Sequence, residues 1–484
     1  MHTKSHARGG KPSSRLHLLV LGAGPAGLAC SHELDRRGYQ TTLIERNPTV
    51  GGLARTIEYK GYRFDLGPHR FYTKNQEVNK FWHEILGHEV LHIKRLTRIL
   101  YDGQLFHYPL KPLDTLWKLG FWSCTIAILS FLHAKWRFAG RPATNFEEWV
   151  VKEFGWRLFN IFFKTYTEKV WGIPCSQIGA EWAAQRIKGL SLGQAIRHAL
   201  FRPRQKFVKS LVDEFDYPRL GAGQVYEILA ALLQEHGHTL NLNHTVSKIR
   251  LRENRIIRVT TQDSSGTETD HAVDFLFSSI PITALIFSLE PVPPPQIIEA
   301  ARRLYYRDHI TVNLIMNRPS VFPDHWIYIH SPEVRMARVS EYGNFSKDML
   351  ADPNCSAVSV EYFCFAHEDL WSSSDQDLLR LAADEVEKVG LVQKSDITDG
   401  FVVREKDSYP TYYVGHRPHF EAVKEYAQSI KNLSLIGRGG MYKYNNQDHA
   451  ILSGILAARF FDGEDVDPWN VNIDEAYLEE KPIE

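Results

Sequence analysis

Apolar residues near the start of the chain follow the order strand, helix, strand. A short apolar run from Leu18 leads into Gly22, a helical stretch follows, and residues 41–44 form a second strand-like run before Glu45. Apolar positions then recur every three or four residues through much of 113–211 and 224–236, which predicts helices. The pattern indicates an α/β protein with a helical insertion.

Strand-like runs dominate the second half of the chain. Residues 240–261 predict a hairpin that turns at 252–255, and residues 275–281 predict a short buried strand. Between residues 308 and 365, four runs alternate in the manner of strands, which predicts an antiparallel sheet over a pocket. The run 433–438 is again strand-like and is predicted to return the chain to its first domain.

These patterns divide the chain, because 484 residues exceed what one hydrophobic core usually holds. We predict a disordered leader (1–14), a helical domain (96–215), an antiparallel-sheet substrate domain (293–395) and a C-terminal tail (466–484). The remaining segments, predicted to form one discontinuous dinucleotide-binding domain, are 15–95, 216–292 and 396–465.

A second apolar run, Leu119 to Leu132, is shorter than the roughly 20 residues that a membrane-spanning helix needs. A buried helix is the first interpretation. The alternative is a helix that lies on a membrane surface, with Trp117, Trp122 and Trp136 as interfacial anchors.

Composition excludes several classes of protein. Lys+Arg and Asp+Glu both number 57, so the chain lacks the basic excess of a general nucleic-acid-binding surface. Five scattered cysteines without a C-x-x-C pair argue against a disulfide framework and fit a reducing compartment, so we expect a cytoplasmic protein. The 22 histidines show no metal-binding spacing, and no metal is expected.

The turn after the first strand carries a dinucleotide fingerprint. Gly22, Gly24 and Gly27 suit the tight turn, the approach of a pyrophosphate and the close packing of helix on strand. Glu45 lies 23 residues after Gly22, near the usual place of the acid that binds ribose hydroxyls. The N-terminus of the following helix offers N–H groups to phosphate.

A second glycine loop distinguishes FAD from NAD. Gly51 and Gly52 permit a backbone turn close to a cofactor, and Arg55 can meet a phosphate. NAD-binding domains do not need this loop, whereas large flavoenzymes wrap the longer FAD with such a segment. The sequence therefore predicts FAD.

Three further segments resemble the UDP-galactopyranose mutase branch of the FAD-dependent amine oxidase and protoporphyrinogen oxidase superfamily. They are the histidine loop 67–75, the stretch 169–174 and the closing segment 437–449, which ends Asn-Gln-Asp-His. The resemblance extends from about residue 16 to 462. It implies a Rossmann-like, GR2-type FAD-binding domain with an inserted helical domain and an antiparallel-sheet substrate domain.

The resemblance also implies roles for individual residues. Catalysis would involve His69 beside the flavin, with Arg186 and Arg338 gripping a diphosphate. The implied substrate contacts are Arg186, Arg338, Tyr409, Tyr444 and Asn446. The implied cofactor contacts are Gly22, Gly24, Pro25, Ala26, Gly27, Glu45, Arg46, Gly52, Leu53, Ala54, Arg55, Gly67, Pro68, His69, Val246, Gly437, Arg438, Asn446, Gln447 and Asp448. Residues 446–448 equally suit a helix cap.

The activity implied by the resemblance is that of an FAD-dependent sugar-nucleotide mutase. Such an enzyme interconverts pyranose and furanose forms through an adduct between reduced flavin N5 and the sugar, without net redox change. The same fold suits an oxidoreductase of the amine oxidase, protoporphyrinogen oxidase or phytoene desaturase type, acting by hydride transfer on a lipophilic or amine substrate. A non-catalytic flavin-bound scaffold is a third interpretation.

The expected partner is a small molecule, with no nucleic acid. Peripheral membrane contact and homo-oligomer formation both stay open. Because no separate NAD(P)H-binding fold is visible, a reductant such as NAD(P)H would have to come from outside the chain.

Overall fold

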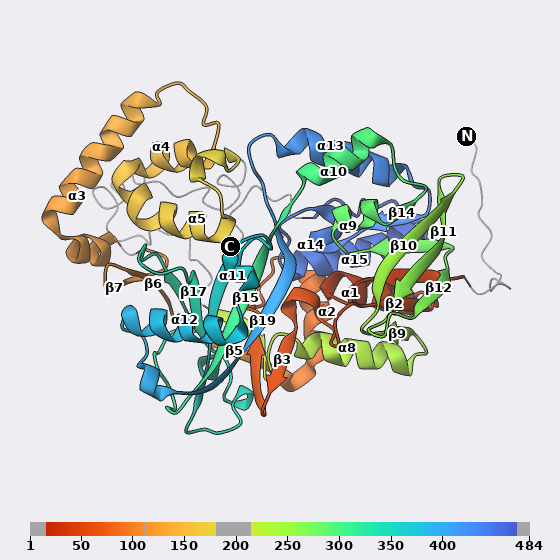
Figure 1. Cartoon of the computed structure of the whole chain (residues 1–484), viewed down its shortest axis with the longest axis horizontal. Coiled ribbons are helices and arrows are strands. Elements are labelled where there is room, and N and C mark those ends of the chain that lie inside the picture. The colour runs from red at the N-terminus through yellow and green to blue at the C-terminus, as the bar shows by residue number, and fades with distance from the viewer. Residues whose placement is uncertain (1–15, 111, 181–213, 472–484) are drawn as a thin grey trace.

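A five-stranded parallel sheet gathers segments from both ends of the chain in the computed structural model, which describes residues 16–110, 112–180 and 214–471 (Figure 1). The order β20-β13-β1-β2-β9 places the last described strand next to β13, in the same sheet as the early strands β1 and β2, so the chain returns to its first domain as predicted. The strands are β1 (Leu18–Leu21), β2 (Thr41–Ile44), β9 (Thr239–Asn241), β13 (Phe275–Ser278) and β20 (Leu433–Leu435).

Both faces of this sheet are covered, which explains its continuously apolar strands. Leu18 and Val20 of β1 pack into one core, and Leu19 and Leu21 pack into a second core on the opposite face. Helices of the first core are α1 (Pro25–Arg36), α2 (Gln76–Leu86), α8 (Gln224–Glu235) and α15 (Gln447–Phe461). Helices of the second are α9 (Ile282–Phe287), α10 (Pro295–Arg303) and α13 (His416–Ser429).

A four-stranded sheet also contributes to the second core. Its order is β12-β11-β10-β14, and β10 and β11 form the predicted hairpin, with a turn at residues 253–254. The strands are β10 (Thr245–Arg252), β11 (Arg255–Gln262), β12 (Glu268–Ala272) and β14 (Leu289–Glu290).

The predicted antiparallel sheet is present and has seven strands, in the order β19-β15-β18-β17-β16-β6-β7. Helix α12 (Asp375–Lys388) packs on one face, and the short helix α11 (Asp369–Ser372) joins that core through Leu370. The strands are β6 (Thr97–Tyr101), β7 (Gln104–His107), β15 (Tyr306–Met316), β16 (Trp326–Ile329), β17 (Arg338–Glu341), β18 (Ser356–Cys364) and β19 (Ile397–Pro410).

Three strands of this sheet lie where the sequence analysis did not place them. Strands β6 and β7 fall in the segment assigned to the helical domain, yet β6 pairs with β16. Strand β19 falls in a segment assigned to dinucleotide binding, yet it pairs with β15 along its length. Which strands pair depends on residues far apart in the sequence, so a local pattern of residues cannot predict the pairing.

Helices and two small sheets complete the fold. The helical unit contains α3 (Pro112–Arg137), α4 (Phe146–Phe159) and α5 (Thr165–Trp171), and it packs on the seven-stranded sheet through Ala337, Phe363 and Tyr409. The two-stranded sheets pair β3 (Thr56–Tyr59) with β4 (Tyr62–Asp65), and β5 (Val90–Lys94) with β8 (Glu214–Pro218). The helical α14 (Gly437–Met441) precedes α15.

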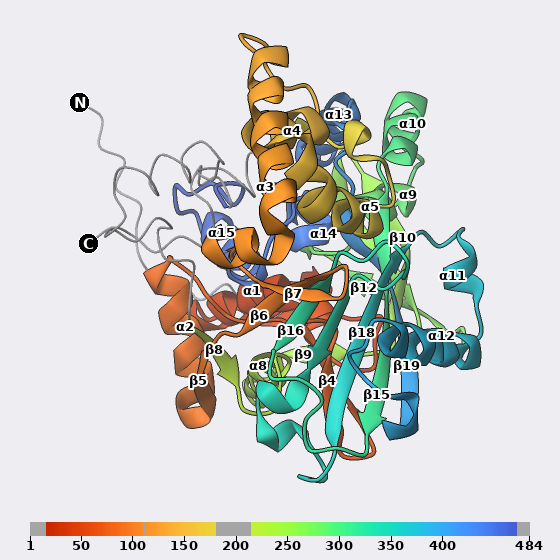
Figure 2. The ribbon, with the colours of Figure 1, turned by 90° about the vertical axis from the view of Figure 1, so that its left-hand side faces the viewer.

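The interpretation of 119–132 as a buried helix is wrong. Helix α3 contains this run, with a break in helical geometry at Gly120. Among the α3 side chains whose burial is described, only Ala127, Phe131 and Ala134 are buried. The cause is that α3 lies at the edge of the molecule, where α4 covers one side of it (Figure 2). Among the helices described, none is long and apolar enough to cross a membrane.

Helices α1 and α15, from opposite ends of the chain, pack almost backbone to backbone. A Cβ atom on Gly454 of α15 would lie 2.2 Å from the carbonyl oxygen of Ala26 and 2.9 Å from the Cys30 nitrogen. Only glycine permits this approach.

We therefore expect Gly454→Ala to lower the free energy of unfolding by about 1–3 kcal/mol, the usual cost of overpacking a core. Denaturant unfolding measures the change. Phe460→Ala is the control, because this side chain of the same helix is exposed, and it should change stability by less than about 0.5 kcal/mol. Equal effects of the two substitutions would contradict the packing argument.

Candidate functional site

A cavity of about 710 Å³ lies where the carboxyl ends of β1, β2 and β13 meet the start of α15. This is the usual place for a ligand in an open parallel sheet, and the volume is that of a small-molecule site. Of the twenty predicted cofactor contacts, all but Gly27 and Gly67 line it. Arg338, Tyr409 and Tyr444 line it as well.

Glycines shape the floor of the cavity. Gly22 has φ +94°, and a Cβ there would lie 2.2 Å from Ser279 Oγ. A Cβ on Gly24 would lie 3.6 Å from the Cα of Gly52, so the two glycine loops touch through their backbones. The surface they leave is open enough for a pyrophosphate to approach main-chain N–H groups.

Gly27 serves the packing that the fingerprint predicts and lies outside the cavity. A Cβ on it would lie 1.9 Å from the carbonyl oxygen of Gly22. It therefore lets α1 lie close to β1, as the fingerprint predicts, and its predicted contact with the cofactor stays a prediction.

Glu45 braces the two turns beside it. One carboxylate oxygen accepts a hydrogen bond from the Ala23 nitrogen at 2.9 Å, and the other accepts one from the Asn47 nitrogen at 2.9 Å. The side chain also lines the cavity, so its remaining lone pairs are placed to accept hydroxyl groups of a ligand.

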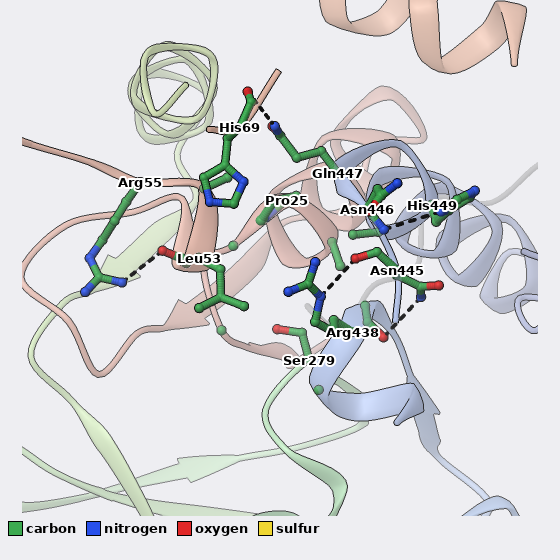
Figure 3. Close-up of a pocket in the computed structure, with 18 of the residues that line it drawn as sticks. Pro25, Leu53, Arg55, His69, Ser279, Arg438, Asn445, Asn446, Gln447 and His449 are labelled. Carbon is green, nitrogen blue, oxygen red and sulfur yellow. Dashed lines mark hydrogen bonds between the residues drawn. The ribbon is translucent and has the colours of Figure 1, made fainter. Parts of the chain in front are cut away.

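Arg55 is held by a partner that the sequence analysis missed. Its guanidinium forms an ion pair with Glu405 of β19 and donates to the Gly52 carbonyl oxygen at 2.9 Å (Figure 3). Glu405 also pairs with Arg46 at 3.3 Å. This carboxylate offsets positive charge that the sequence analysis assigned to a phosphate.

The opposite wall begins with the N-terminus of α15. Asn446 is the N-cap, as the capping interpretation predicts, and its backbone N–H donates to His449 Nδ1 at 3.3 Å. Gln447 Nε2 donates to the His69 carbonyl oxygen at 3.2 Å, and Gln447 Oε1 accepts from the Tyr226 hydroxyl at 2.6 Å (Figure 3). The two ends of the chain therefore meet at the cavity.

His69 is a neutral imidazole at the cavity wall. Burial, with the nearby Arg438 and Arg338 cations, lowers the pKa of His69 to about 3. Its Nε2 lies 3.2 Å from the Leu66 carbonyl oxygen, so Nε2 carries the proton and Nδ1 is the acceptor nitrogen. At neutral pH this side chain offers a fixed tautomer and no charge.

Arg338 belongs to a buried charge cluster. Its Nε donates to Glu361 at 2.6 Å, Nη2 donates to the other carboxylate oxygen, and His309 Nε2 lies 3.0 Å from Glu361. Arg338 and His309 offset the cost of burial and bring the pKa of Glu361 down to about 2. The two hydrogen bonds fix the plane of the guanidinium.

Gly67 lies over this ion pair, where a Cβ would be 2.9 Å from Glu361 Oε2 and 3.0 Å from Arg338 Nη2. Gly67 is not among the residues that line the cavity, and its predicted contact with the cofactor stays a prediction. It makes room for the Arg338–Glu361 pair.

Arg438 contributes a second guanidinium to the same wall. It lies 5.0 Å from the ring centroid of Tyr409 and 4.9 Å from that of Tyr444, and its Nε donates to the Asn445 carbonyl oxygen at 2.9 Å. The two rings are 5.4 Å apart. Cation–π contact and the hydrogen bond hold this charge in place.

The lining of the cavity is cationic although the whole chain is neutral. Four acidic side chains line it, namely Glu45, Glu405, Asp407 and Asp448. Seven basic side chains line it, namely Arg46, Arg55, Arg70, Lys74, Arg338, Lys406 and Arg438. The electrostatics favour ligands that carry diphosphate groups.

Some lining residues escaped the sequence analysis. Ser279 follows β13 just as Gly22 follows β1, so its position after a predicted strand was the signal available. Glu405 and Tyr328 come from the seven-stranded sheet, and no local motif marks them. Arg186 lies outside the described residues, and its role stays a prediction.

The chain is similar to known flavoproteins. The family profile of "Flavin containing amine oxidoreductase" matches residues 25–459. A solved structure of reduced UDP-galactopyranose mutase superposes with a TM-score of 0.79 at 21% identity, covering 93% of this chain and 94% of that one. At that identity, the likeness shows the fold alone.

Relatives by sequence share shorter segments. A "Probable UDP-galactopyranose mutase" of Klebsiella pneumoniae is 25% identical over 170 residues, which are 34% of this chain and 43% of the relative. A 1-hydroxycarotenoid 3,4-desaturase of a Flavobacterium species is 47% identical over 53 residues, 11% of each chain. The matched segments thus cover less than half of these relatives.

The buried Glu361 predicts a pH dependence of stability. Its pKa is lower in the folded chain than in the unfolded one, so its contribution is complete above about pH 4.5 and is lost as the pH falls toward about 2. We expect Glu361→Gln to lower the free energy of unfolding at pH 7 by about 3 kcal/mol and to flatten its decline between pH 5 and pH 3.

Urea unfolding at several pH values tests this expectation. Asp399→Asn is the control, because Asp399 pairs with the exposed Lys60 and such pairs contribute about 0–1 kcal/mol. A Glu361→Gln protein that keeps the wild-type pH profile would refute the assignment.

Proposed function

Because this chain belongs to the flavin-containing amine oxidoreductase family, we propose that it is an FAD-dependent enzyme that rearranges the sugar of a nucleoside-diphosphate sugar. The family implies FAD. Mutase activity is the more specific part of this proposal, and it rests on one observation. Two guanidinium groups, Arg338 and Arg438, and two phenols, Tyr409 and Tyr444, line one wall of the cavity with His69.

This wall suits a substrate diphosphate. Arg338 is oriented by Glu361, and Arg438 is oriented by the two tyrosine rings, so neither has to reorganise when an anion binds. Preorganised cations stabilise the negative charge that develops as a nucleoside diphosphate leaves a sugar. A hydrocarbon would bury these charged and phenolic groups without adding any hydrogen-bond partner, which favours a polar ligand.

The residues that would hold FAD fit the dinucleotide. Gly22, Gly24 and Gly52 leave the backbone of the glycine loops open to the pyrophosphate, and Glu45 is placed for ribose hydroxyls. The N-terminus of α15 presents the positive end of its dipole to the cavity wall. When bound and reduced, the flavin supplies the nucleophile for the anomeric carbon of the sugar. The reductant is an external donor such as NAD(P)H.

His69 would position groups in the site without carrying charge. Because its pKa is near 3, the imidazole stays neutral at working pH and does not compete with the arginines for an anion. Its backbone carbonyl is bound to Gln447, which fixes the histidine loop to α15.

An FAD-dependent oxidoreductase is the second candidate. The observation that favours it is the local similarity to a carotenoid desaturase and to L-amino acid oxidases of snakes, one of which, from Crotalus durissus cumanensis, is 31% identical over 114 residues. The two candidates differ in stoichiometry. A mutase turns over without consuming reductant, whereas an oxidase consumes oxygen or another acceptor with every turnover.

The experiment uses purified protein reduced with dithionite and a panel of nucleoside-diphosphate sugars, with ring forms separated by chromatography. We expect wild type to interconvert a pyranose and a furanose form. Arg338→Lys keeps a charge beside Glu361 but loses the guanidinium fork, so its Kd for the nucleoside diphosphate should rise roughly 10- to 100-fold.

The FAD content of Arg338→Lys should equal that of wild type. Arg318→Lys, which alters a partly exposed ion pair with Asp396, is the matched control and should bind the nucleotide normally. Stoichiometric oxygen consumption, or unchanged nucleotide affinity in Arg338→Lys, would reject the mutase in favour of the oxidoreductase.

A further prediction concerns FAD retention. A Cβ on Gly52 would come within 3.2 Å of the Gly24 Cα, and Gly52 has φ +55°. Gly52→Ala should therefore reduce the flavin absorbance per chain several-fold. Gly103→Ala carries the same type of backbone strain, at φ +69°, with open space around it, and should retain wild-type flavin. Flavin loss in both variants would point to general destabilisation.

A further inference from the structure

Exposed apolar side chains gather on one helix. Among the described residues, fourteen large apolar side chains are exposed, and eight of them belong to α3. These eight form the α3 apolar patch, which consists of Trp117, Phe121, Trp122, Ile126, Ile128, Leu129, Leu132 and Trp136. Helix α3 projects at the margin of the molecule (Figures 1 and 2).

The patch is the solvent-facing side of a helix whose opposite side packs against the protein. Ala127, Phe131 and Ala134 on the other face are buried, and Gly155 of α4 lies so close that a Cβ there would be 2.6 Å from the Phe131 nitrogen. The tight packing of the buried face shows that α3 is not rotated so as to expose a side that belongs in the core. It keeps its apolar side chains in water while the opposite face is tightly packed.

The order of residues along the patch matches a lipid interface. Trp122 and Trp136, 77% and 76% exposed, lie on either side of the exposed aliphatic side chains, and Trp117 lies at the start of the patch. Fourteen residues separate the two tryptophans, about 21 Å along a helix. Indole rings prefer the headgroup region, and aliphatic side chains prefer the acyl boundary beneath it.

Charge around the patch has one predominant sign. Residues 112–141 contain four basic side chains, Lys118, Lys135, Arg137 and Arg141, and one acidic side chain, Asp114, in a chain that is neutral overall. Lys118 pairs with Asp114 at 2.7 Å, and Lys135 pairs with Glu153 of α4 at 3.3 Å. Arg137 and Arg141 are exposed.

We propose that the α3 apolar patch docks the protein on the surface of an anionic lipid bilayer, with α3 lying in the plane of the interface. The helix does not span, because its buried face packs on α4 and no described helix is both long and apolar enough to cross a membrane. A second copy is the less favourable occupant, since a two-fold contact between identical patches would bring their basic residues together. Anionic headgroups attract the same residues.

The start of α3 packs near one residue of the functional cavity. One apolar cluster contains Leu119 of α3, Phe106 of β7 and Tyr328 of β16, and Tyr328 lines the cavity. This proposal concerns the α3 apolar patch, and it does not depend on which reaction takes place in the cavity.

Vesicle flotation with the full-length, flavin-loaded protein tests the proposal. The probes are phosphatidylcholine vesicles with and without phosphatidylglycerol. Wild type should float with the anionic vesicles and less with the neutral ones. The variant Trp122→Ser/Leu129→Ser/Trp136→Ser should lower the partition coefficient on anionic vesicles at least about tenfold, since it removes three of the exposed anchors.

The matched control is Ile257→Ser/Val292→Ser/Phe460→Ser, which removes three exposed apolar side chains from other elements. It should float within about twofold of wild type. Flavin content and unfolding midpoint establish that both variants are folded. Equal flotation of the two variants, or a wild type that stays unbound, overturns the proposal. So does an unbound wild-type dimer that the α3 variant converts to a monomer on size exclusion, because the patch would then join two copies.

Discussion

The close packing of α1 on α15 is the constraint on which the site depends. Gly454 allows the helix from the end of the chain to rest on the backbone of the helix from its beginning. The N-termini of both helices then lie at the same cavity, one following the glycine fingerprint and the other capped by Asn446. The contact between Gln447 and the His69 carbonyl closes the arrangement. A looser helix pair would separate groups that have to contact one ligand.

The buried charged groups around the cavity are held in ion pairs. Glu361 is fully buried and ionised because Arg338 and His309 face it. Glu405 forms ion pairs with Arg55 and Arg46. Each carboxylate holds guanidinium groups in fixed orientation at the cavity wall, and burial together with the cations of Arg438 and Arg338 keeps His69 neutral. Because the charged groups of the wall are already oriented before binding, little reorganisation is needed when an anion binds.

Much of this site could be predicted from the sequence, because its first part is local. The glycine fingerprint, Glu45 and the second glycine loop lie within 34 residues, and the turns they form depend on neighbours in the chain. The partners of the charged residues could not be predicted. Glu405 is 350 positions from Arg55, and only the pairing of β19 with β15 brings it to the site. The exposure of α3 was equally hidden, because an apolar run has the same composition whether protein or solvent covers it.

The two sheets supply different parts of the site, and this explains why the fold alone does not determine the reaction. The parallel sheet and its glycine loops supply the features that suit a dinucleotide, and a fold does not by itself determine a reaction. The wall that would face a substrate comes partly from the seven-stranded sheet, since Tyr328, Arg338 and Tyr409 lie on β16, β17 and β19, and partly from Arg438 of α14. A molecule bound against this wall would contact those side chains, so the choice of substrate would depend on them rather than on the glycine loops.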